Sequence, residues 1–355
     1  MSQTCEALRV RALVYDAFAG AIEVRQVPEP SPPEAGVVVR VGATGVCRSD
    51  WHAWRGHDPD ITLPHVPGHE LAGTVEAVGP GVRRWRVGDR VTAPFVCACG
   101  RCPRCLAGEH QVCDAQTQPG FTHWGSFAEL VMLDAADVNL VRIPDALGVA
   151  AAASLGCRYS TAFRAVVQQG RPAAGEWVAV HGCGGVGLSA VQVAVAAGAR
   201  VVAVDVAPGA LLLAAQFGAE HVLDARGLGP EAVAAAVRDL TGGGAGVSLD
   251  AVGSSSTCVG SVLCLLPRGR HVQVGLLPPA QGRPPVPMDR VVALELALLG
   301  SHGMAAHAYP QLLGLVVAGR LRPDLLVTRE IGLDDAGQAL ASVGSHPGVT
   351  VITSF

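Results

Sequence analysis

The first 150 residues carry short hydrophobic runs that Gly and Pro interrupt. β-Branched residues dominate these runs and turn-forming residues bound them, which is typical of β-strands. The clearest runs span residues 36–46, 70–79 and 89–94. This pattern predicts an irregular all-β body with long loops.

The pattern changes near residue 155, where apolar stretches of strand length begin to alternate with Ala-rich helical stretches. The predicted strands cover 177–180, 200–206, 247–252 and 271–276, and the predicted helices cover 188–199 and 210–219. Such alternation predicts a parallel, doubly wound sheet. More helix follows from about residue 289, and a last apolar strand covers 350–354.

The two patterns divide the chain into about two domains, which its 355 residues also favour. We expect an α/β protein with a β domain at 1–154 and a doubly wound domain at 155–290. A return segment at 291–355 then completes the sheet and packs on the first domain.

Composition excludes several functions. Half of the residues are hydrophobic, only 16% are charged, and the net charge is −4, so no basic surface for nucleic acid or anionic lipid is expected. All 26 basic residues are Arg, which excludes a Schiff-base lysine and a P-loop lysine. No apolar run predicts a membrane helix. The 11 cysteines, without a secretory segment, favour reduced thiols in the cytoplasm and metal or redox chemistry.

A glycine-rich loop follows the strand at 177–180 and opens a helix. Its sequence HGCGGVG has the spacing G-x-G-x-x-G in the strand–helix context that a dinucleotide-binding loop requires. Such a loop allows a tight turn, and its helix N-terminus offers N–H groups to a pyrophosphate. The residues expected to contact the cofactor here are Gly182, Gly184, Gly185, Val186 and Gly187.

Asp205 ends the next predicted strand. An acid at this offset binds the adenosine ribose hydroxyls and repels a 2′-phosphate, and no Arg follows it closely. The sequence therefore favours NAD over NADP.

Four cysteines lie close together in the sequence CGRCPRCLAGEHQVC. A tetrahedral structural Zn²⁺ site suits four thiolates on such a short loop. An iron–sulfur cluster and disulfides remain alternatives. The four residues are Cys99, Cys102, Cys105 and Cys113.

Other possible metal ligands are scattered. Cys47 lies in GVCRSDWH, His69 and Glu70 lie in PGHE, and Cys157 lies in LGCRYSTAF. Spacing alone does not bring them together, and a lone Cys or His is more often a core residue than a metal ligand.

The chain resembles the zinc-dependent alcohol dehydrogenases of the medium-chain dehydrogenase/reductase family. The matching stretches appear in family order over nearly the whole length. They are GVCRSD, PGHELAG, VGDRV, the four-cysteine loop, GCRYSTA, and GCGGVG followed by its acid. The resemblance implies a GroES-like catalytic domain with both zinc sites and a Rossmann NAD-binding domain.

The resemblance also implies a catalytic zinc held by Cys47, His69 and Cys157, with the fourth position open to water or alcohol. The family's activity is reversible oxidation of alcohols to aldehydes or ketones, by hydride transfer from a zinc-bound alkoxide to nicotinamide. In this family Glu70 corresponds to a carboxylate beside the metal. Asp50 corresponds to the acid that orients His69.

Further residues carry over from the family. Ser49 matches the hydroxyl that contacts the alcohol oxygen, and His52 matches the residue that exchanges the proton with solvent. Arg48 is expected at the pyrophosphate, Thr161 at the nicotinamide and Val274 at the carboxamide.

The sequence departs from the family in two places near the dinucleotide. Position 210 is Ala where many relatives carry Lys or Arg, and the C-terminal stretch SHPGVTVITSF lacks the usual Arg. Both changes remove positive charge, so NAD binding is expected to be retained but weaker.

Four aromatic residues bear on the choice of substrate. Trp51, Trp54, Phe95 and Trp124 flank the ligands and are candidates for an apolar substrate cavity, with structural packing as the alternative. Primary aliphatic or aromatic alcohols are the expected substrates. A polyol or amino-alcohol dehydrogenase of the same fold, or a non-catalytic NAD-binding homologue, is the alternative. We expect a homo-oligomer, a tetramer rather than a dimer, with the apolar segment 291–300 at its interface.

Overall fold

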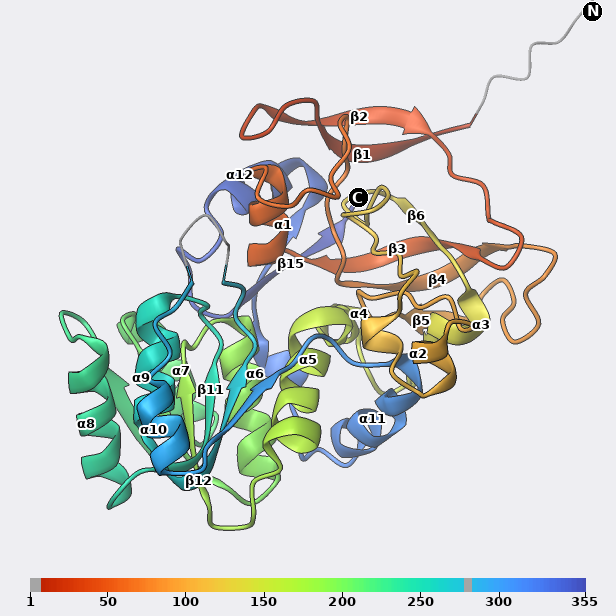
Figure 1. The fold of residues 1–355 in the computed structure, drawn as a ribbon. Helices are drawn as coiled ribbons and strands as arrows, with labels where there is room; N and C mark the ends of the chain where they lie inside the picture. Colours follow the sequence, from red (N-terminus) through yellow and green to blue (C-terminus); the bar gives the residue numbers. More distant parts are fainter. Residues whose placement is uncertain (1–7, 278–282) are drawn as a thin grey trace, which may run out of the picture.

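Two large sheets organise the molecule. The computed structural model describes residues 8–277 and 283–355. Within these residues the strands form a two-stranded hairpin, a seven-stranded mixed sheet and a six-stranded parallel sheet. Figure 1 shows the mixed sheet and the parallel sheet as two bodies, with α5 (Ser160–Phe163) between them.

The mixed sheet has the order β14-β15-β3-β4-β5-β7, and β6 pairs with β3. The strands predicted at 36–46, 70–79 and 89–94 correspond to β3, β4 and β5. The strands of this body are β1 (Arg9–Tyr15), β2 (Ile22–Pro28), β3 (Val37–Gly45), β4 (Leu71–Val78), β5 (Arg90–Thr92), β6 (Leu130–Leu133), β7 (Val141–Arg142), β14 (Val327–Gly332) and β15 (Val349–Ser354).

The second sheet is parallel throughout, with the order β10-β9-β8-β11-β12-β13. Because β9 lies on one side of β8 and β11 on the other, the strand order reverses at β8, where doubly wound sheets bind their ligands. The strands are β8 (Trp177–His181), β9 (Arg200–Asp205), β10 (His221–Asp224), β11 (Ala245–Asp250), β12 (Leu265–Gln273) and β13 (Ala297–Gly300).

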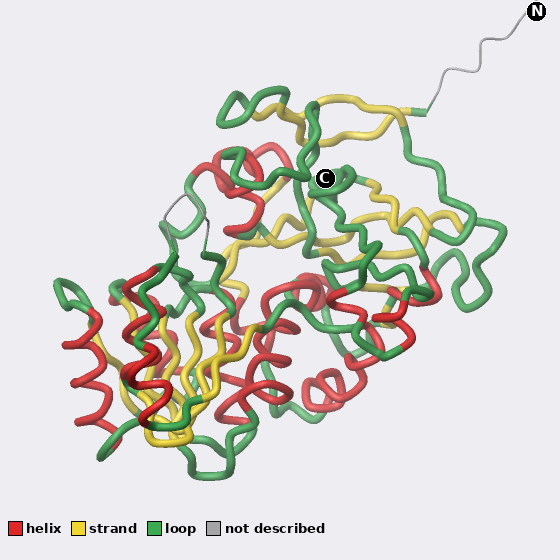
Figure 2. The backbone as a smooth tube through the Cα atoms, in the orientation of Figure 1, coloured by secondary structure: helices red, strands yellow, loops and turns green. Residues whose placement is uncertain are grey.

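Helices cover both faces of the parallel sheet (Figure 2). Val178 and Val180 of β8 pack in one core with α6 (Gly185–Ala196). The alternate residues Trp177 and Ala179 pack in another core with α8 (Pro230–Thr241). Burial on both faces explains why the strands are continuously apolar instead of alternating.

One continuous helical segment connects the two bodies. It runs through α4 (Val149–Ala153), the π-helical turn η2 (Leu155–Tyr159), α5 and the π-helical turn η3 (Arg164–Gly170). The other helices are α1 (Arg48–Trp54), α2 (Pro103–Leu106), α3 (Ala136–Asn139), α7 (Pro208–Gln216), α9 (Ser255–Leu263), α10 (Met288–Ala293), α11 (Tyr309–Val317) and α12 (Ala336–Ala341). The remaining 3₁₀ turns are η1 (His110–Val112), η5 (Ala306–Ala308), η6 (Pro323–Leu326) and η7 (Leu333–Asp335).

The C-terminal segment contributes to both bodies. β13 forms an edge of the parallel sheet, and β14 and β15 then join the mixed sheet. β15 pairs with β3 where Val351 faces Gly45, two residues before Cys47. The chain end therefore supports the loop that carries the first candidate metal ligand, while the exact domain boundaries at 154 and 290 stay predictions. Among the described residues, no helix combines the length and apolarity needed to cross a bilayer.

Candidate active site and metal centres

Four side chains from distant parts of the chain meet in one buried cluster. One ligand atom from each of Cys47, His69, Glu70 and Cys157 lies within 4.8 Å of all the others, and all four residues are buried. Cys47 caps the N-terminus of α1, the middle two residues precede β4, and Cys157 lies in η2. The structure thus brings together the three ligands that spacing alone could not assemble.

Backbone pairing explains this convergence. The Gly45 N–H donates to the Glu70 carbonyl at 2.8 Å, which places the end of β3 beside the start of β4. The Phe95 N–H donates to the Gly156 carbonyl at 2.9 Å, which ties η2 to the loop after β5. Each ligand therefore sits within two residues of a hydrogen bond between segments.

Asp50 holds His69 in place. Its Oδ1 lies 2.8 Å from His69 Nδ1, and its Oδ2 accepts from the Cys47 N–H at 2.9 Å. Burial alone would lower the pKa of His69, but the Asp50 carboxylate raises this pKa well above its usual value. With Nδ1 engaged by Asp50, Nε2 is the nitrogen left for another partner.

The two thiols of the cluster ionise as a pair. Hydrogen bonding from Cys157 lowers the pKa of Cys47 well below its usual value, and Cys47 in turn raises that of Cys157. One thiolate therefore forms readily, and a bound cation would displace the second proton.

Arg158 is a residue that our sequence reasoning missed. Its Nε donates to Glu70 Oε1 at 2.9 Å, its Nη2 lies 2.7 Å from Oε2, and the same Nη2 donates to the Val46 carbonyl. Both side chains are almost wholly buried. Burial raises the pKa of Glu70 to about 7 although Arg158 opposes this. A charged residue next to Cys157, inside a long apolar stretch, was the available signal.

The cluster fits a zinc ion. His69 Nε2 is buried and has no hydrogen-bond partner among the described residues, although it lies beside two cysteine sulfurs. Two thiolates and one imidazole nitrogen with a free position form the ligand set of a catalytic zinc.

The four-cysteine loop forms a second, separate cluster. Sulfur–sulfur distances are 3.5 Å for Cys102–Cys105, 3.7 Å for Cys102–Cys113 and 4.0 Å for Cys99–Cys105. A tetrahedron with Zn–S bonds of about 2.3 Å has sulfurs about 3.8 Å apart. All ten cysteines among the described residues are free, so disulfides find no support.

The environment of this second cluster is made of backbone amides. The N–H groups of Arg101 and Cys102 lower the pKa of Cys99 to about 6. Burial raises the pKa of Cys105 to about 12, and the neighbouring thiols add to this rise. No acidic side chain belongs to the cluster within the described chain.

The cofactor loop has the geometry that its glycines predict. Gly182 adopts φ +90, and a Cβ on Gly187 would lie 1.7 Å from the Gly182 carbonyl oxygen. Gly184 caps α6, and a Cβ there would meet nothing within 4 Å. The Gly184 side of the α6 N-terminus is therefore open, as a bound pyrophosphate requires.

Asp205 lies at the end of β9, beside that loop. Its carboxylate accepts backbone N–H groups from Cys183, Val206 and Ala207. The residue lines a cavity of about 270 Å³ with Gly182 and residues of α8 and α9, a size suited to an adenosine.

Comparison with known proteins agrees with this geometry. The family model described as "Alcohol dehydrogenase GroES-like domain" matches residues 33–145, and the model described as "Zinc-binding dehydrogenase" matches residues 185–318. An alcohol dehydrogenase of Geobacillus stearothermophilus is 37% identical over 82% of this chain and 84% of its own. The chain belongs to the zinc-binding alcohol dehydrogenases.

Two other similarities bear on cofactor and substrate. A solved structure named as an NAD-dependent alcohol dehydrogenase has a TM-score of 0.86 and 31% identity, and covers 97% of this chain and 100% of its own. A sorbitol dehydrogenase of Halalkalibacterium halodurans is 28% identical over 94% of this chain and 95% of its own. The expected fold class, GroES-like domain plus Rossmann sheet, is confirmed, as are zinc- and NAD-dependent alcohol oxidation as the family activity.

The two expected proton-relay residues, Ser49 and His52, lie on α1, the helix that Cys47 caps. Ser49 Oγ is 3.9 Å from the Cys47 sulfur. His52 Nδ1 lies 2.9 Å from Nδ1 of His57, an exposed residue. Burial, with His57 and Arg48 nearby, lowers the pKa of His52.

Three further residues are expected at the cofactor, and the structure gives each of them different contacts. Thr161 is buried and its hydroxyl has no partner among the described residues. Val274 follows β12, and its N–H is already donated to the Asp250 carbonyl. The Arg48 guanidinium stacks on Trp51 at 4.8 Å and reaches the Val343 carbonyl at 3.4 Å.

The candidate substrate aromatics lie in different places. Phe95 packs with Cys47 and Cys157, at the catalytic cluster. Trp51 packs on His52, and Trp54 donates to the Gly20 carbonyl in a structural contact.

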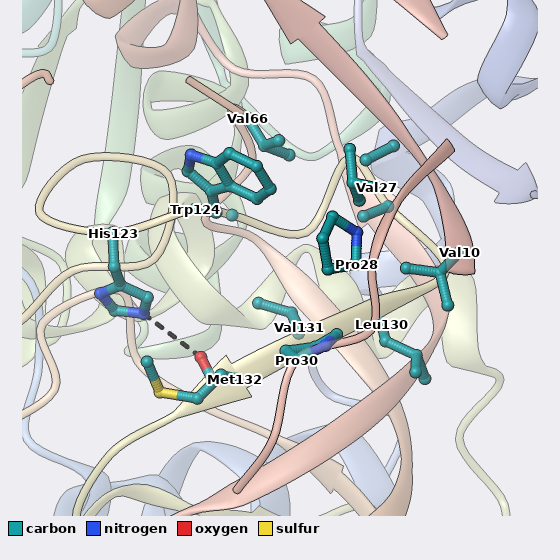
Figure 3. A pocket seen from close by; sticks show the side chains of 13 residues that line it. Val10, Val27, Pro28, Pro30, Val66, His123, Trp124, Leu130, Val131 and Met132 are labelled. Carbon is teal, nitrogen blue, oxygen red and sulfur yellow. Dashed lines mark hydrogen bonds between the residues drawn. The ribbon is translucent and has the colours of Figure 1, made fainter. Parts of the chain in front are cut away.

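Trp124 lines a different pocket, of about 130 Å³, shown in Figure 3. The pocket is enclosed by His123, Val66 and apolar residues of β1, β2 and β6, and none of its lining residues is a candidate metal ligand. The indole Nε1 donates to the Pro64 carbonyl at 3.0 Å. The packing interpretation therefore fits Trp124 better than a role in the substrate cavity.

Proposed function

We propose that Cys47, His69 and Cys157 hold the catalytic zinc of this alcohol dehydrogenase, and that small primary alcohols are its substrates. The observation that carries the proposal is the unpartnered, buried His69 Nε2 beside two thiols. When bound, zinc lowers the pKa of a coordinated hydroxyl and nicotinamide accepts a hydride.

The chain's own residues supply positioning and proton transfer. Asp50 keeps His69 in one tautomer and orientation, because it accepts from Nδ1. Ser49 receives the proton from the alcohol, and His52 passes it to solvent. The direct contact between His52 and His57 extends this path to an exposed side chain.

NAD is the proposed dinucleotide. A 2′-phosphate in the cavity beside Asp205 would meet a carboxylate, and electrostatic repulsion would weaken its binding. Kinetics with NAD⁺ and NADP⁺ on wild-type and Asp205→Gly protein test this. We expect the preference for NAD⁺ to fall at least tenfold in the variant, and an unchanged preference would contradict the assignment.

A substrate screen tests the activity itself. Protein with verified zinc content is assayed with NAD⁺ and ethanol, benzyl alcohol, sorbitol or threonine. We expect turnover of the first two. Activity confined to sorbitol and threonine would instead support the polyol or amino-alcohol alternative, which the sorbitol dehydrogenase similarity favours. Full zinc loading without any turnover would support the non-catalytic alternative.

We further propose a cytoplasmic homotetramer. The free cysteines are compatible with a reducing compartment. β13 is an edge strand, and Val292 and Leu298 in the segment 291–300 are exposed. Light scattering that reports a monomer would contradict the tetramer, and burial of this segment in a crystal of the oligomer would support it.

A further inference from the structure

A second, polar cavity lies apart from the residues assigned above. Its volume is about 380 Å³, and it opens between the loop of the four cysteines, the turn η3 and the turn η5. Its polar lining residues are Glu109, Gln111, Arg164, Gln168, Gln169 and His307.

Arg164 lines this cavity, and its guanidinium group makes no close ion pair with a carboxylate of the described residues. Its side chain is only 13% exposed, yet its nearest polar contacts are Ser301 Oγ at 3.5 Å and Glu109 Oε2 at 3.8 Å. Charge-assisted hydrogen bonds measure about 2.7–2.9 Å. Glu109 Oε2 also accepts from the side-chain amide of Gln111, so it is not a dedicated partner. Most of the five guanidinium N–H donors remain available.

Other arginines of this protein are paired closely with a carboxylate. Arg40 and Arg200 each make a two-pronged contact with a glutamate at 2.5–2.9 Å, although both are far more exposed than Arg164. The wholly buried Arg158 is paired with Glu70 in the same way. A half-buried arginine beside a cavity, without such a partner, is expected to bind an anion from outside.

A second observation points to the same place. The Nδ1 atom of His110 is buried and has no partner among the described residues. The His110 ring packs edge-on against His307, a lining residue, with centroids 4.8 Å apart. Arg164 and the amides of Gln168 and Gln169 are the side-chain donors that line the cavity, and the unpartnered His110 lies behind His307.

The cavity also lies near the catalytic cluster. Cys157, Thr161 and Arg164 lie seven residues apart, first to last, on one helical segment that runs through η2, α5 and η3. His302, which does not line the cavity, links it to the catalytic cluster: it contacts the Phe95 ring and lies 3.2 Å from the carbonyl oxygen of the lining residue Gln111.

We propose that this cavity binds an oxyanion, a carboxylate or a phosphate, with Arg164 as its main partner. The anion has two possible sources: a separate small ion, or the far end of an alcohol substrate that carries a carboxylate. Only the second source rests on the proposed function.

Calorimetry on the zinc-loaded protein, at constant ionic strength, tests the site independently of turnover. Inorganic phosphate and glutarate are titrated into wild-type protein and three variants. We expect at least tenfold weaker binding for Arg164→Gln, and several-fold tighter binding for Glu109→Gln, because this change removes the competing carboxylate. Arg171→Gln, which neutralises an exposed arginine just after the same helical segment, is the matched control and should bind as wild type does. Equal binding by wild type and Arg164→Gln, or no binding by wild type, would overturn the proposal.

Kinetics then distinguish the sources. The ratio of kcat/KM for 6-hydroxyhexanoate to that for 1-hexanol is measured with NAD⁺. A ratio that falls at least tenfold in Arg164→Gln, but not in Arg171→Gln, assigns the anion to the substrate. Arg164-dependent binding in calorimetry with an unchanged ratio assigns it to a separate ion. If wild type turns over no alcohol, the proposed function fails, and calorimetry still decides whether the site exists.

Discussion

The two metal clusters of this protein use similar ligands but are built in different ways. The cluster at Cys47, His69 and Cys157 draws on three segments, the first and last of which are 110 positions apart, and all its residues are buried. The cluster between Cys99 and Cys113 lies on one loop, with two of its four residues partly exposed. The first depends on the whole fold for its geometry, whereas the second depends only on a short stretch of chain.

Their surroundings differ as well. The side chains of Asp50, Glu70 and Arg158 surround the first cluster, whereas backbone N–H groups surround the second. Carboxylates and guanidinium groups tune a ligand set that must leave a position open for chemistry. Amide donors only stabilise four thiolates, which is sufficient for a closed site.

The largest effect is expected from Cys47→Ala. This change removes one catalytic ligand without disturbing the contact between Asp50 and His69. Turnover should fall by about 10³-fold or more, since the Lewis acid is lost. Metal analysis should find about one zinc per chain instead of two, with a melting temperature within a few degrees of wild type. Wild-type turnover by the variant would contradict the assignment.

Cys105→Ser should lower the melting temperature strongly and leave the catalytic zinc in place. Zinc binding at this site contributes to the free energy of folding, so its loss destabilises the protein. We expect the melting temperature to fall by about 10 °C or more. Calorimetry measures this change. Protein that remains folded should keep the catalytic zinc, so retention of both zinc ions would count against the closed four-thiolate site.

Arg158→Met should destabilise the protein by about 3–4 kcal/mol, because it leaves the buried Glu70 carboxylate without its partner. Denaturant unfolding measures this loss. The double variant Arg158→Met with Glu70→Gln is the control and should recover much of the stability. If the double variant is no more stable than the single one, packing and not charge explains the loss.

Asp50→Asn keeps the shape of the side chain but removes its charge. We expect zinc affinity or kcat/KM to fall about 10–100-fold, the usual cost of losing a carboxylate behind a histidine ligand. Competition with a chelator measures the affinity. The other cluster offers no matching change, because its sulfurs accept from backbone N–H groups and contact one another among the described residues.

His57→Gln should have the smallest effect. The pKa of His52 is lowered by burial and also by His57, so the substitution should raise it. Because neutral His52 accepts the proton during alcohol oxidation, the acidic limb of the kcat–pH profile should move to higher pH by a few tenths of a unit. A shift to lower pH would contradict the proposed relay.

The sequence predicts these two clusters to different degrees. The spacing of the cysteines within Cys99–Cys113 is enough to predict a metal site, and the glycine spacing from Gly182 to Gly187 is enough to predict a cofactor loop. Local geometry determines both features. Cys47, His69 and Cys157 could be grouped only through the family resemblance, since β-sheet pairing brings them together.

Other features depended on the three-dimensional context. Arg158 was missed because its partner Glu70 is 88 positions away. Trp124 lies near the ligands in sequence, yet it points into another pocket (Figure 3). The unmatched charge of Arg164 is visible only when its neighbours are known. The Arg158 side chain also lies against Gly185 of the cofactor loop, although its charge is already paired with Glu70.

Diffraction data collected on both sides of the zinc absorption edge test the central claim most directly. We expect two anomalous peaks per chain. One should lie within about 2.0–2.3 Å of Cys47 Sγ, His69 Nε2 and Cys157 Sγ, and the other should lie among the four loop sulfurs. A fully zinc-loaded protein without a peak at the first position would contradict it.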